Sequence, residues 1–284
     1  MRLLIEHPLF SSVRDFIEHS ATEITRSPRP VLIVSKPSLN GSLSVAPIEA
    51  ALLDEGIPYR RRFSISDPNT DTFIRIIDDH DSNPQTNSPS SQVSISATTV
   101  EGLRGRLGDS RKGLLSTVAQ SHALAQAISQ NSSRLRRIRP WILSGNWISD
   151  ALDTTYDPVF TALRDFLSTE GSIRIVPVTE VESPYITNYK WLESVDLEAA
   201  SNNWQSFDPG RREKSMDSLA RSALTRNQPS TARLEELLWH CILGPDWRSD
   251  LASQITRASE FWDNMPPIDA ASELADLLLS KGTI

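Results

Sequence analysis

The sequence has a single cysteine and no long apolar run, and each absence narrows what the protein can be. Cys241 alone excludes an internal disulfide framework and favours a reducing compartment. No stretch of the 284 residues approaches the roughly 20 apolar residues of a membrane span. Glu6, His7 and Pro8 interrupt the short apolar start, so we expect no cleavable signal segment. The composition therefore predicts a soluble, cytoplasmic protein with no membrane partner.

The sequence is also short of positive charge. Its 36 acidic side chains outnumber 29 basic ones and give a net charge of −7. A strong, self-sufficient nucleic-acid binder needs clustered Lys and Arg, so that class is disfavoured. Local basic patches remain, and they are either solubilising surface charge or weak contacts for single-stranded nucleic acid or an acidic protein. The candidate contacts are Arg104, Arg106, Arg111, Lys112, Arg134, Arg136 and Arg137.

P-loop, dinucleotide, zinc and nucleophile-elbow signatures are missing as well. The most informative segment that is present is 31–41, VLIVSKPSLNG. Its first four residues are continuously apolar, as in a strand covered on both faces of a sheet. Apolar residues at helical spacing then predict a helix over 42–55, with Ser42 or Ser44 as its N-cap. Residues 58–63 return as a second strand.

This strand–loop–helix–strand unit resembles the DHH phosphoesterases. The relevant branch contains RecJ-like exonucleases, the archaeal GINS-associated nuclease and an inactive eukaryotic relative that activates the replicative helicase. In that family the first strand ends in Ser-His-x-Asp-x-Asp-Gly, and a Gly-(Ile/Val)-Pro-like turn follows the helix. The chain keeps this frame as Ser35, Pro37 and Gly41, with Glu55-Gly56-Ile57-Pro58-Tyr59 after the helix.

The resemblance places the metal ligands of the family on unsuitable residues. The family's histidine falls on Lys36, and its two aspartates fall on Ser38 and Asn40. The name-giving Asp-His-His falls on Ser96-Ala97-Thr98, and a further metal-binding aspartate falls on Asn146. Enzymes of this family are understood to use two divalent ions, which need converging anionic oxygens. Neutral groups and a lysine argue against such a site. We therefore expect no catalytic residues and no metal cofactor.

One acidic cluster keeps an alternative open. Asp78, Asp79, His80 and Asp81 follow a predicted strand and, with Asp109, form a candidate residual metal or polar site. Asp and Ser also favour turns at strand ends, and we prefer that interpretation of the cluster. If the cluster does hold a metal, the cofactor is Mn²⁺ or Mg²⁺.

The order of elements predicts two regions. Residues 1–190 form an α/β domain, with a parallel sheet and helices on both faces, and residues 191–284 form a mainly helical C-terminal region. Segment 105–113 is predicted to be a glycine-punctuated loop before a helix over 114–128, in which His122 is a buried core residue. A strand near 173–178 continues the α/β pattern. The C-terminal region holds five of the seven tryptophans, which either pack helices or mark a protein interface.

Three functions follow from these observations. The leading expectation is a non-catalytic RecJ-like protein, a structural or regulatory subunit in DNA replication or repair whose partners are GINS-like or helicase components. The alternative is a metal-dependent phosphoesterase or nuclease of altered specificity that uses a reduced ligand set. The third is an unrelated α/β protein that shares only the strand–loop–helix outline.

Overall fold

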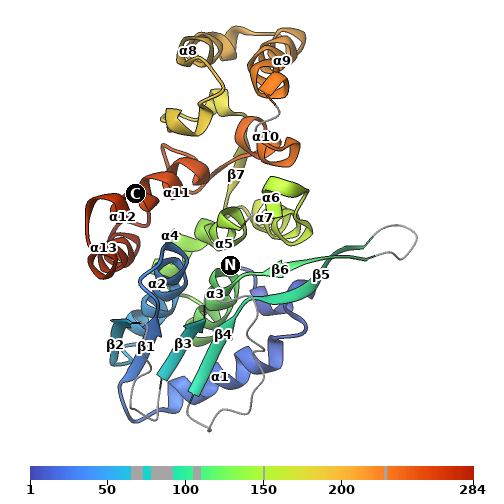
Figure 1. Cartoon of the computed structure of the whole chain (residues 1–284). Coiled ribbons are helices and arrows are strands. Elements are labelled where there is room, and N and C mark those ends of the chain that lie inside the picture. Colours follow the sequence, from blue (N-terminus) through green and yellow to red (C-terminus); the bar gives the residue numbers. More distant parts are fainter. Residues whose placement is uncertain (65–72, 78–91, 105–109, 150, 227–228) are drawn as a thin grey trace.

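A four-stranded, all-parallel sheet forms one end of the molecule (Figure 1). The computed structural model describes residues 1–64, 73–77, 92–104, 110–149, 151–226 and 229–284. The strand order is β2-β1-β3-β4. The strands are β1 (Val31–Ser35), β2 (Tyr59–Phe63), β3 (Phe73–Ile77) and β4 (Gln92–Ser96). The predicted fold class, a parallel α/β sheet followed by a helical C-terminal region, is confirmed.

The central strand β1 explains why this sheet forms. It pairs with β2, where Val31 lies opposite Tyr59, and with β3, where Leu32 lies opposite Phe73. Its apolar run is buried on both faces except at the partly exposed Leu32, as expected for an inner parallel strand. Because all four strands are parallel, their carboxyl ends meet at one edge, which is where open α/β sheets place their ligands.

Three long helices pack on the sheet or on one another. They are α1 (Arg14–Arg26), which follows 3-10 turns at Leu4–Glu6 and Pro8–Phe10, α2 (Leu39–Asp54) and α3 (Thr117–Ile128). Helix α2 packs against β1, β3 and α3, while α3 packs against β4 and α1. The predicted N-cap of α2 at Ser42 or Ser44 is wrong. The cap is Ser38, and the helix continues through Pro47.

An antiparallel hairpin, β5 (Thr98–Arg104) and β6 (Ser110–Leu115), projects from the body as an arm (Figure 1). The prediction of a loop over 105–113 is therefore wrong for residues 110–113, which lie in β6. The following helix begins at Thr117 instead of Leu114, because Ser116 caps it through the Ala119 amide. The next elements are α4 (Ser133–Ile138), a 3-10 turn (Arg139–Leu143), α5 (Ser144–Ile148), α6 (Ala151–Thr154) and α7 (Pro158–Glu170).

The C-terminal region contacts the α/β region at several places. Strand β7 (Arg174–Val176) pairs antiparallel with β8 (Cys241–Leu243), so the strand predicted near 173–178 does not continue the parallel sheet. Helix α13 returns to pack on α2 (Figure 1). The helices of this region are α8 (Ser194–Asn203), α9 (Pro209–Arg226), α10 (Thr231–Leu238), α11 (Leu251–Ser259), α12 (Phe261–Asn264) and α13 (Pro267–Ser280), with 3-10 turns at Val178–Glu180, Ile186–Tyr189 and Trp204–Ser206.

Most of the C-terminal tryptophans pack inside the fold. Trp191, Trp204 and Trp247 are buried, and Trp239 and Trp262 are partly buried against the core. These positions favour a packing role over a broad exposed aromatic interface. Within the described part of the chain, none of the helices combines the length and apolarity needed to cross a membrane.

Candidate functional site

The loop after β1 is built around Ser38 and Gly41. Ser38 has extended backbone, and its Oγ accepts a hydrogen bond from the Gly41 amide at 3.0 Å, which caps α2. A side chain at position 41 has no room, because its Cβ would lie 2.5 Å from Ser35 Oγ and even closer to the Lys36 carbonyl oxygen. Lys36 itself is exposed. Ser38, which the resemblance aligns with an aspartate ligand, thus begins a helix.

Asn40, at the second aspartate position, joins two helices. Its Nδ2 donates to Thr117 Oγ1 at 2.9 Å. The Ser44 hydroxyl donates to the same oxygen at 3.1 Å. Both donors lie on α2 and the acceptor is the first residue of α3. The Asn40 amide therefore holds the first turns of α2 and α3 together.

The end of β4 also meets the first turns of α3. The Ser96 carbonyl accepts a hydrogen bond from Gln120 Nε2 at 2.6 Å, and Gln120 reaches the Leu115 carbonyl at 3.0 Å. Thr98 donates its hydroxyl to the Ser96 carbonyl at 3.3 Å. Ser96 Oγ is buried and has no hydrogen-bond partner within the described residues. The segment Ser96-Ala97-Thr98 therefore connects β4 to the hairpin and contributes small neutral groups to the edge.

Asn146 lies in the middle of α5 and is 1% exposed. Its Nδ2 donates to the Leu114 carbonyl at 2.7 Å and to Asp157 Oδ2 at 2.8 Å. The neighbouring Gly145 lies against the α3 cap, since a Cβ there would come within 2.6 Å of Ser116 Oγ. Asn146 thus connects α5 to the end of β6.

The structure therefore brings three of the predicted ligand positions together around the first turns of α3. Asn40 comes from the first turn of α2, Ser96 from the end of β4 and Asn146 from α5. We call this group, with Ser38, Thr117 and Gln120, the sheet edge. Its side chains are hydroxyls and amides, which form weak ligands for hard divalent ions compared with carboxylates.

Asp157 is a buried carboxylate that the sequence analysis missed. It is 2% exposed, accepts from Asn146 through Oδ2, and through Oδ1 accepts from the Val159 and Phe160 amides at 2.9 and 3.2 Å. The last two bonds make it the N-cap of α7. The signal was present as Asp157-Pro158, because Asp at the cap followed by Pro at the first helical position marks a helix start.

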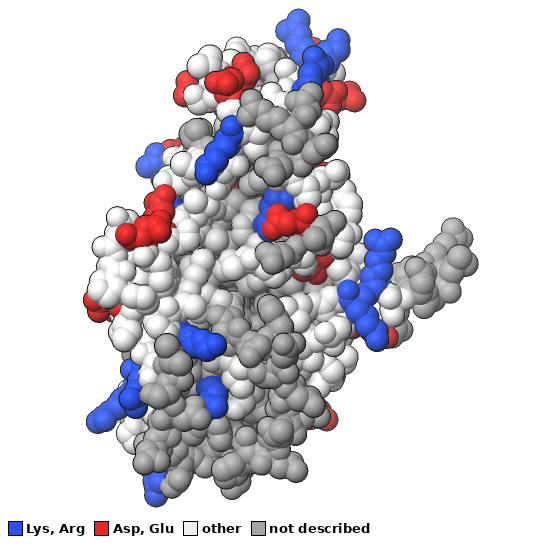
Figure 2. All heavy atoms as spheres, viewed as in Figure 1, with Lys and Arg blue, Asp and Glu red and all other residues white. Residues whose placement is uncertain are grey.

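Basic side chains are scattered over the face shown in Figure 2 and do not form one continuous patch there. Among the candidate contacts, Arg111 and Lys112 are exposed on the arm, and Arg136 is exposed on α4. The side chain of Arg104 and all of Arg106 lie outside what the structure describes. The arm thus carries at least two exposed basic side chains.

The other two basic candidates on α4 make structural contacts. Arg134 forms an ion pair with Asp54 at the end of α2. Burial alone would raise the pKa of the Asp54 carboxyl, but hydrogen bonds from Ser132 and Arg134 bring this pKa below its ordinary value. Arg137 donates to the Ser280 carbonyl at 2.6 Å and thereby holds the end of α13. Neither arginine is a free basic contact.

The C-terminal helices contact the loop after β1, helix α2 and strand β2. Trp262, in α12, donates its indole N–H to the Pro37 carbonyl at 3.0 Å. Arg61, on β2, forms ion pairs at 2.9 Å with Glu49 of α2 and with Asp276 of α13. Burial raises the pKa of Glu49 to about 7, although the Arg61 guanidinium pulls it downward. These contacts fix the C-terminal region to the loop and helix that follow β1.

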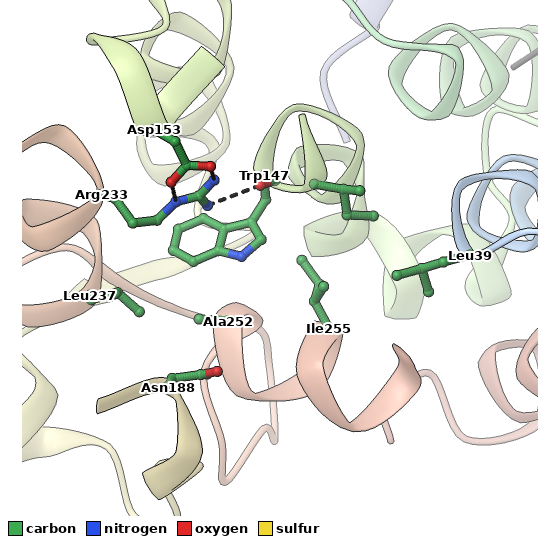
Figure 3. Close-up of a pocket in the computed structure, with 9 residues that line it drawn as sticks. Leu39, Trp147, Asp153, Asn188, Arg233, Leu237, Ala252 and Ile255 are labelled. Carbon is green, nitrogen blue, oxygen red and sulfur yellow. Dashed lines mark hydrogen bonds and ion pairs between the residues drawn. The ribbon is translucent and has the colours of Figure 1, made fainter. Parts of the chain in front are cut away.

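A pocket of about 310 Å³ opens between the sheet edge and the C-terminal helices (Figure 3). We call it the Trp147 pocket. Its lining residues come from the start of α2, from α5 and α6, from the 3-10 turn Ile186–Tyr189, and from α10 and α11. They are Leu39, Trp147, Ile148, Asp153, Asn188, Arg233, Leu237, Ala252 and Ile255.

One wall of the Trp147 pocket is fixed by Arg233. The guanidinium lies over the Trp147 ring, 4.5 Å from its centroid. Its Nε and Nη2 donate to the two carboxylate oxygens of Asp153, each at 2.9 Å, and its Nη1 donates to the Trp147 carbonyl at 2.9 Å. The wall is therefore held in place by a bidentate ion pair, a ring contact and a backbone bond.

The alternative metal site predicted from the sequence lies in segments that the structure does not describe. Asp78, Asp79, His80, Asp81 and Asp109 all lie outside the described residues. Among the residues that are described, no group of three or more His, Cys, Asp or Glu side chains is placed to hold a metal ion. His122, the solitary helical histidine, is 3% exposed, and burial, followed by the charge of Arg139, lowers its pKa to about 3. It is a neutral core residue.

Comparison with known proteins gives no further assignment: no family model matches the chain, and no curated protein matches it.

Proposed function

We propose that the chain is a non-catalytic, RecJ-like protein that acts as a structural or regulatory subunit in DNA replication or repair. Its partners would be protein components of the replicative helicase assembly, GINS-like or helicase subunits. The observation that supports this proposal is the use of Ser38, Asn40 and Asn146 as internal hydrogen-bonding groups. A two-metal phosphoesterase needs anionic oxygens at such positions, directed toward the ions.

The covering of the loop after β1 supports the same proposal. A nuclease must admit a substrate strand to the carboxyl edge of the sheet. Here Trp262 of the chain's own α12 bonds to the Pro37 carbonyl, and α13 packs on α2 behind it. The net charge of −7 also disfavours a strong hold on a phosphate backbone.

A cleavage assay tests the absence of catalysis. The full chain is incubated with end-labelled single-stranded DNA and RNA in Mn²⁺, in Mg²⁺ and in EDTA. We expect no metal-dependent products. Cleavage that disappears in Asp79→Asn would overturn the proposal and favour the alternative, a phosphoesterase using Asp78 to Asp81 and Asp109. Cleavage that persists in that variant would point to a contaminant, which a second purification removes.

Partner capture tests the assembly role. The tagged chain is purified from its native cell at low and high salt, and co-purifying proteins are identified by mass spectrometry. We expect components of the helicase assembly. Nuclease treatment of the lysate distinguishes direct protein contacts from contacts bridged by DNA. Recovery of no replication or repair protein under either salt condition would count against the role.

The arm is the place to test weak nucleic-acid binding. Arg111→Gln with Lys112→Gln removes both exposed basic side chains of β6. If the arm contacts single-stranded DNA, binding at low salt should weaken and its salt dependence should become shallower by about one unit per lost contact. Unchanged binding would identify these residues as solubilising charge.

A further inference from the structure

We propose that a second pocket, which lies beside α9 and which we call the Trp239 pocket, binds an arginine side chain of a partner protein. It shares no lining residue with the Trp147 pocket, and Figure 1 shows α9 at the end of the molecule opposite the sheet. The inference rests on the proposed function of the chain as a partner-binding subunit. It names the chemistry by which one partner would be recognised.

The Trp239 pocket has an aromatic and apolar interior of about 340 Å³. Trp204 and Met216 are only 5% and 3% exposed and form its inner wall. Trp239 and Pro177 are partly exposed and complete the apolar lining. A guanidinium group is planar and is carried on a methylene stem that packs well on apolar surface. An arginine side chain therefore suits an interior of this kind.

Two carboxylates beside this interior select a cation. Glu213 and Asp217 line the pocket, and both are exposed. They lie four positions apart on α9, which places them on one face of the helix with Cβ atoms about 5–6 Å apart. Within the part of the chain that the structure describes, neither side chain forms an ion pair or a hydrogen bond. Because two like charges at this spacing repel each other, a cation bound between them is stabilised by both.

Arg212 is the only cation among the described lining residues, and it is already engaged. Its guanidinium lies over the Trp204 ring, 5.1 Å from the centroid, and its Nε donates to the Trp204 carbonyl at 3.2 Å. One positive and two negative side chains leave the lining with a net charge of −1. The Arg212 contact also shows how a guanidinium is held in this pocket, over an indole ring and hydrogen-bonded to an oxygen.

Trp239 offers a second indole ring for the same kind of contact. It is partly buried, and no cation lies over its ring among the described residues. An indole face attracts a cation, and a guanidinium can stack on it while its N–H groups bind carboxylate oxygens. A lysine ammonium is a compact, strongly hydrated point charge that gains less from stacking. Trp239 together with Glu213 and Asp217 therefore favours arginine over lysine and over a neutral or acidic side chain.

Capped amino acids test the site directly. The full chain, labelled with ¹⁵N in its tryptophans, is titrated with N-acetyl-argininamide, and the Trp239 signal is identified by its absence in Trp239→Phe. We expect a saturable shift of this signal at millimolar concentration, with weaker binding of N-acetyl-lysinamide. N-acetyl-citrullinamide has nearly the shape of the arginine compound without its charge and should give no saturable shift.

A buried tryptophan provides the internal control of the titration. The signal of Trp141, whose indole N–H is bonded to the Gly282 carbonyl at 3.0 Å, should stay in place. Absence of a saturable shift at Trp239 with N-acetyl-argininamide, or equal binding of the citrulline compound, would overturn the inference.

Two double variants then separate the local carboxylates from the net charge of the chain. Glu213→Gln with Asp217→Asn keeps the size of both side chains and should weaken binding of N-acetyl-argininamide at least tenfold. Asp15→Asn with Glu18→Gln removes two exposed carboxylates of α1, at the sheet end of the molecule, and should change binding by less than twofold. Because all four side chains are exposed, both variants should fold as the parent chain does. Equal weakening in the two double variants would contradict a site at α9.

The outcome is separable from that of the proposed function. Metal-dependent cleavage would remove the non-catalytic role and leave the Trp239 pocket in place. Failure of N-acetyl-argininamide to bind would remove this docking site and leave the non-catalytic role unaffected.

Discussion

The sheet edge and the Trp147 pocket meet at the start of α2 and are built in opposite ways. At the sheet edge, polar side chains are hydrogen-bonded within the fold: Asn40 to Thr117, Gln120 to the Ser96 carbonyl, and Asn146 to Asp157. At the pocket, apolar side chains surround open space and the charged pair lies at the wall. A hydrogen-bonded edge contributes to folding, whereas an open apolar pocket leaves surface available for binding. Substitutions should therefore cost stability at the edge and little stability at the pocket.

Asn146→Ala should give the largest loss. It leaves Asp157 Oδ2 and the Leu114 carbonyl without their donor and opens a small cavity in a site that is 1% exposed. We expect the free energy of unfolding to fall by about 3 kcal/mol in urea titrations. Asn203→Ala is the matched control, because Asn203 donates to a backbone carbonyl at 2.8 Å but is exposed. Its change should stay within about 0.5 kcal/mol. Equal losses in both variants would contradict the structural role of Asn146.

Gly41→Ala tests the close packing of the β1 loop. The added Cβ would meet Ser35 Oγ at 2.5 Å and the Lys36 backbone, which cannot move away as a flexible side chain can. We expect a loss of about 2 kcal/mol, measured by thermal and urea unfolding. The Cβ of Gly210→Ala, in α9, would meet Asp208 Oδ1 at an ordinary 3.4 Å. That control should keep its stability or gain up to about 1 kcal/mol. A neutral result at position 41 would mean that the loop adapts freely.

The Glu49–Arg61 pair gives the link between the two regions a pH dependence. Burial raises the pKa of Glu49 to about 7 in the folded chain, against 4.5 for an ordinary glutamate. Between pH 4.5 and 7 the folded state therefore binds more protons than the unfolded state. The contribution of neutral Glu49 to the free energy of unfolding is complete below pH 4.5 and is lost as the pH rises through 7. At pH 8 the charged carboxylate depends on Arg61.

Arg61→Met should consequently cost more at pH 8 than at pH 5. We expect about 1.5–2 kcal/mol at pH 8, where a buried carboxylate loses its partner, and a clearly smaller loss at pH 5. Asp276→Asn removes the other partner of Arg61. Because the Asp276 side chain is 63% exposed, this variant should cost about 0.5 kcal/mol or less at both pH values. Urea titrations at the two pH values measure all three chains. A loss for Arg61→Met that is independent of pH would show that the ion pair is not what stabilises this contact.

Short-range sequence patterns correctly predicted the strand and the helix whose formation depends mainly on residues close in sequence. The apolar run of β1 and the helix that ends before Gly56 follow from short-range periodicity, and both are present. The cap of α2 was misplaced because Ser38, Ser42 and Ser44 are chemically equivalent in sequence. Only the backbone conformation distinguishes Ser38, which is extended, from the two helical serines.

Contacts between residues that are far apart in the sequence explain the other differences between the predicted and the observed structure. Strand β7 pairs with β8, which follows it in the chain only after helices α8, α9 and α10, and Trp262 bonds to Pro37 across 225 positions of sequence. The hairpin was hidden because its strands are polar and its stability comes from pairing. The sequence located the candidate ligand positions, but it held no local sign that Asn146 would meet Asp157 or that Leu39 would line a pocket with Ile255.

Arg233→Met should give the smallest effect on stability and thereby sharpen the contrast with the sheet edge. The variant loses the bidentate pair to Asp153, which is 51% exposed, but its apolar chain still covers the Trp147 ring. We expect a loss of about 0.5–1 kcal/mol, because partly exposed pairs and cation–π contacts contribute modestly. Arg248→Met, which breaks the more exposed pair with Glu182, should leave the free energy of unfolding unchanged. If Arg233→Met instead cost as much as Asn146→Ala, the pocket wall would belong to the folding core, and the contrast between a hydrogen-bonded edge and an open pocket would fail.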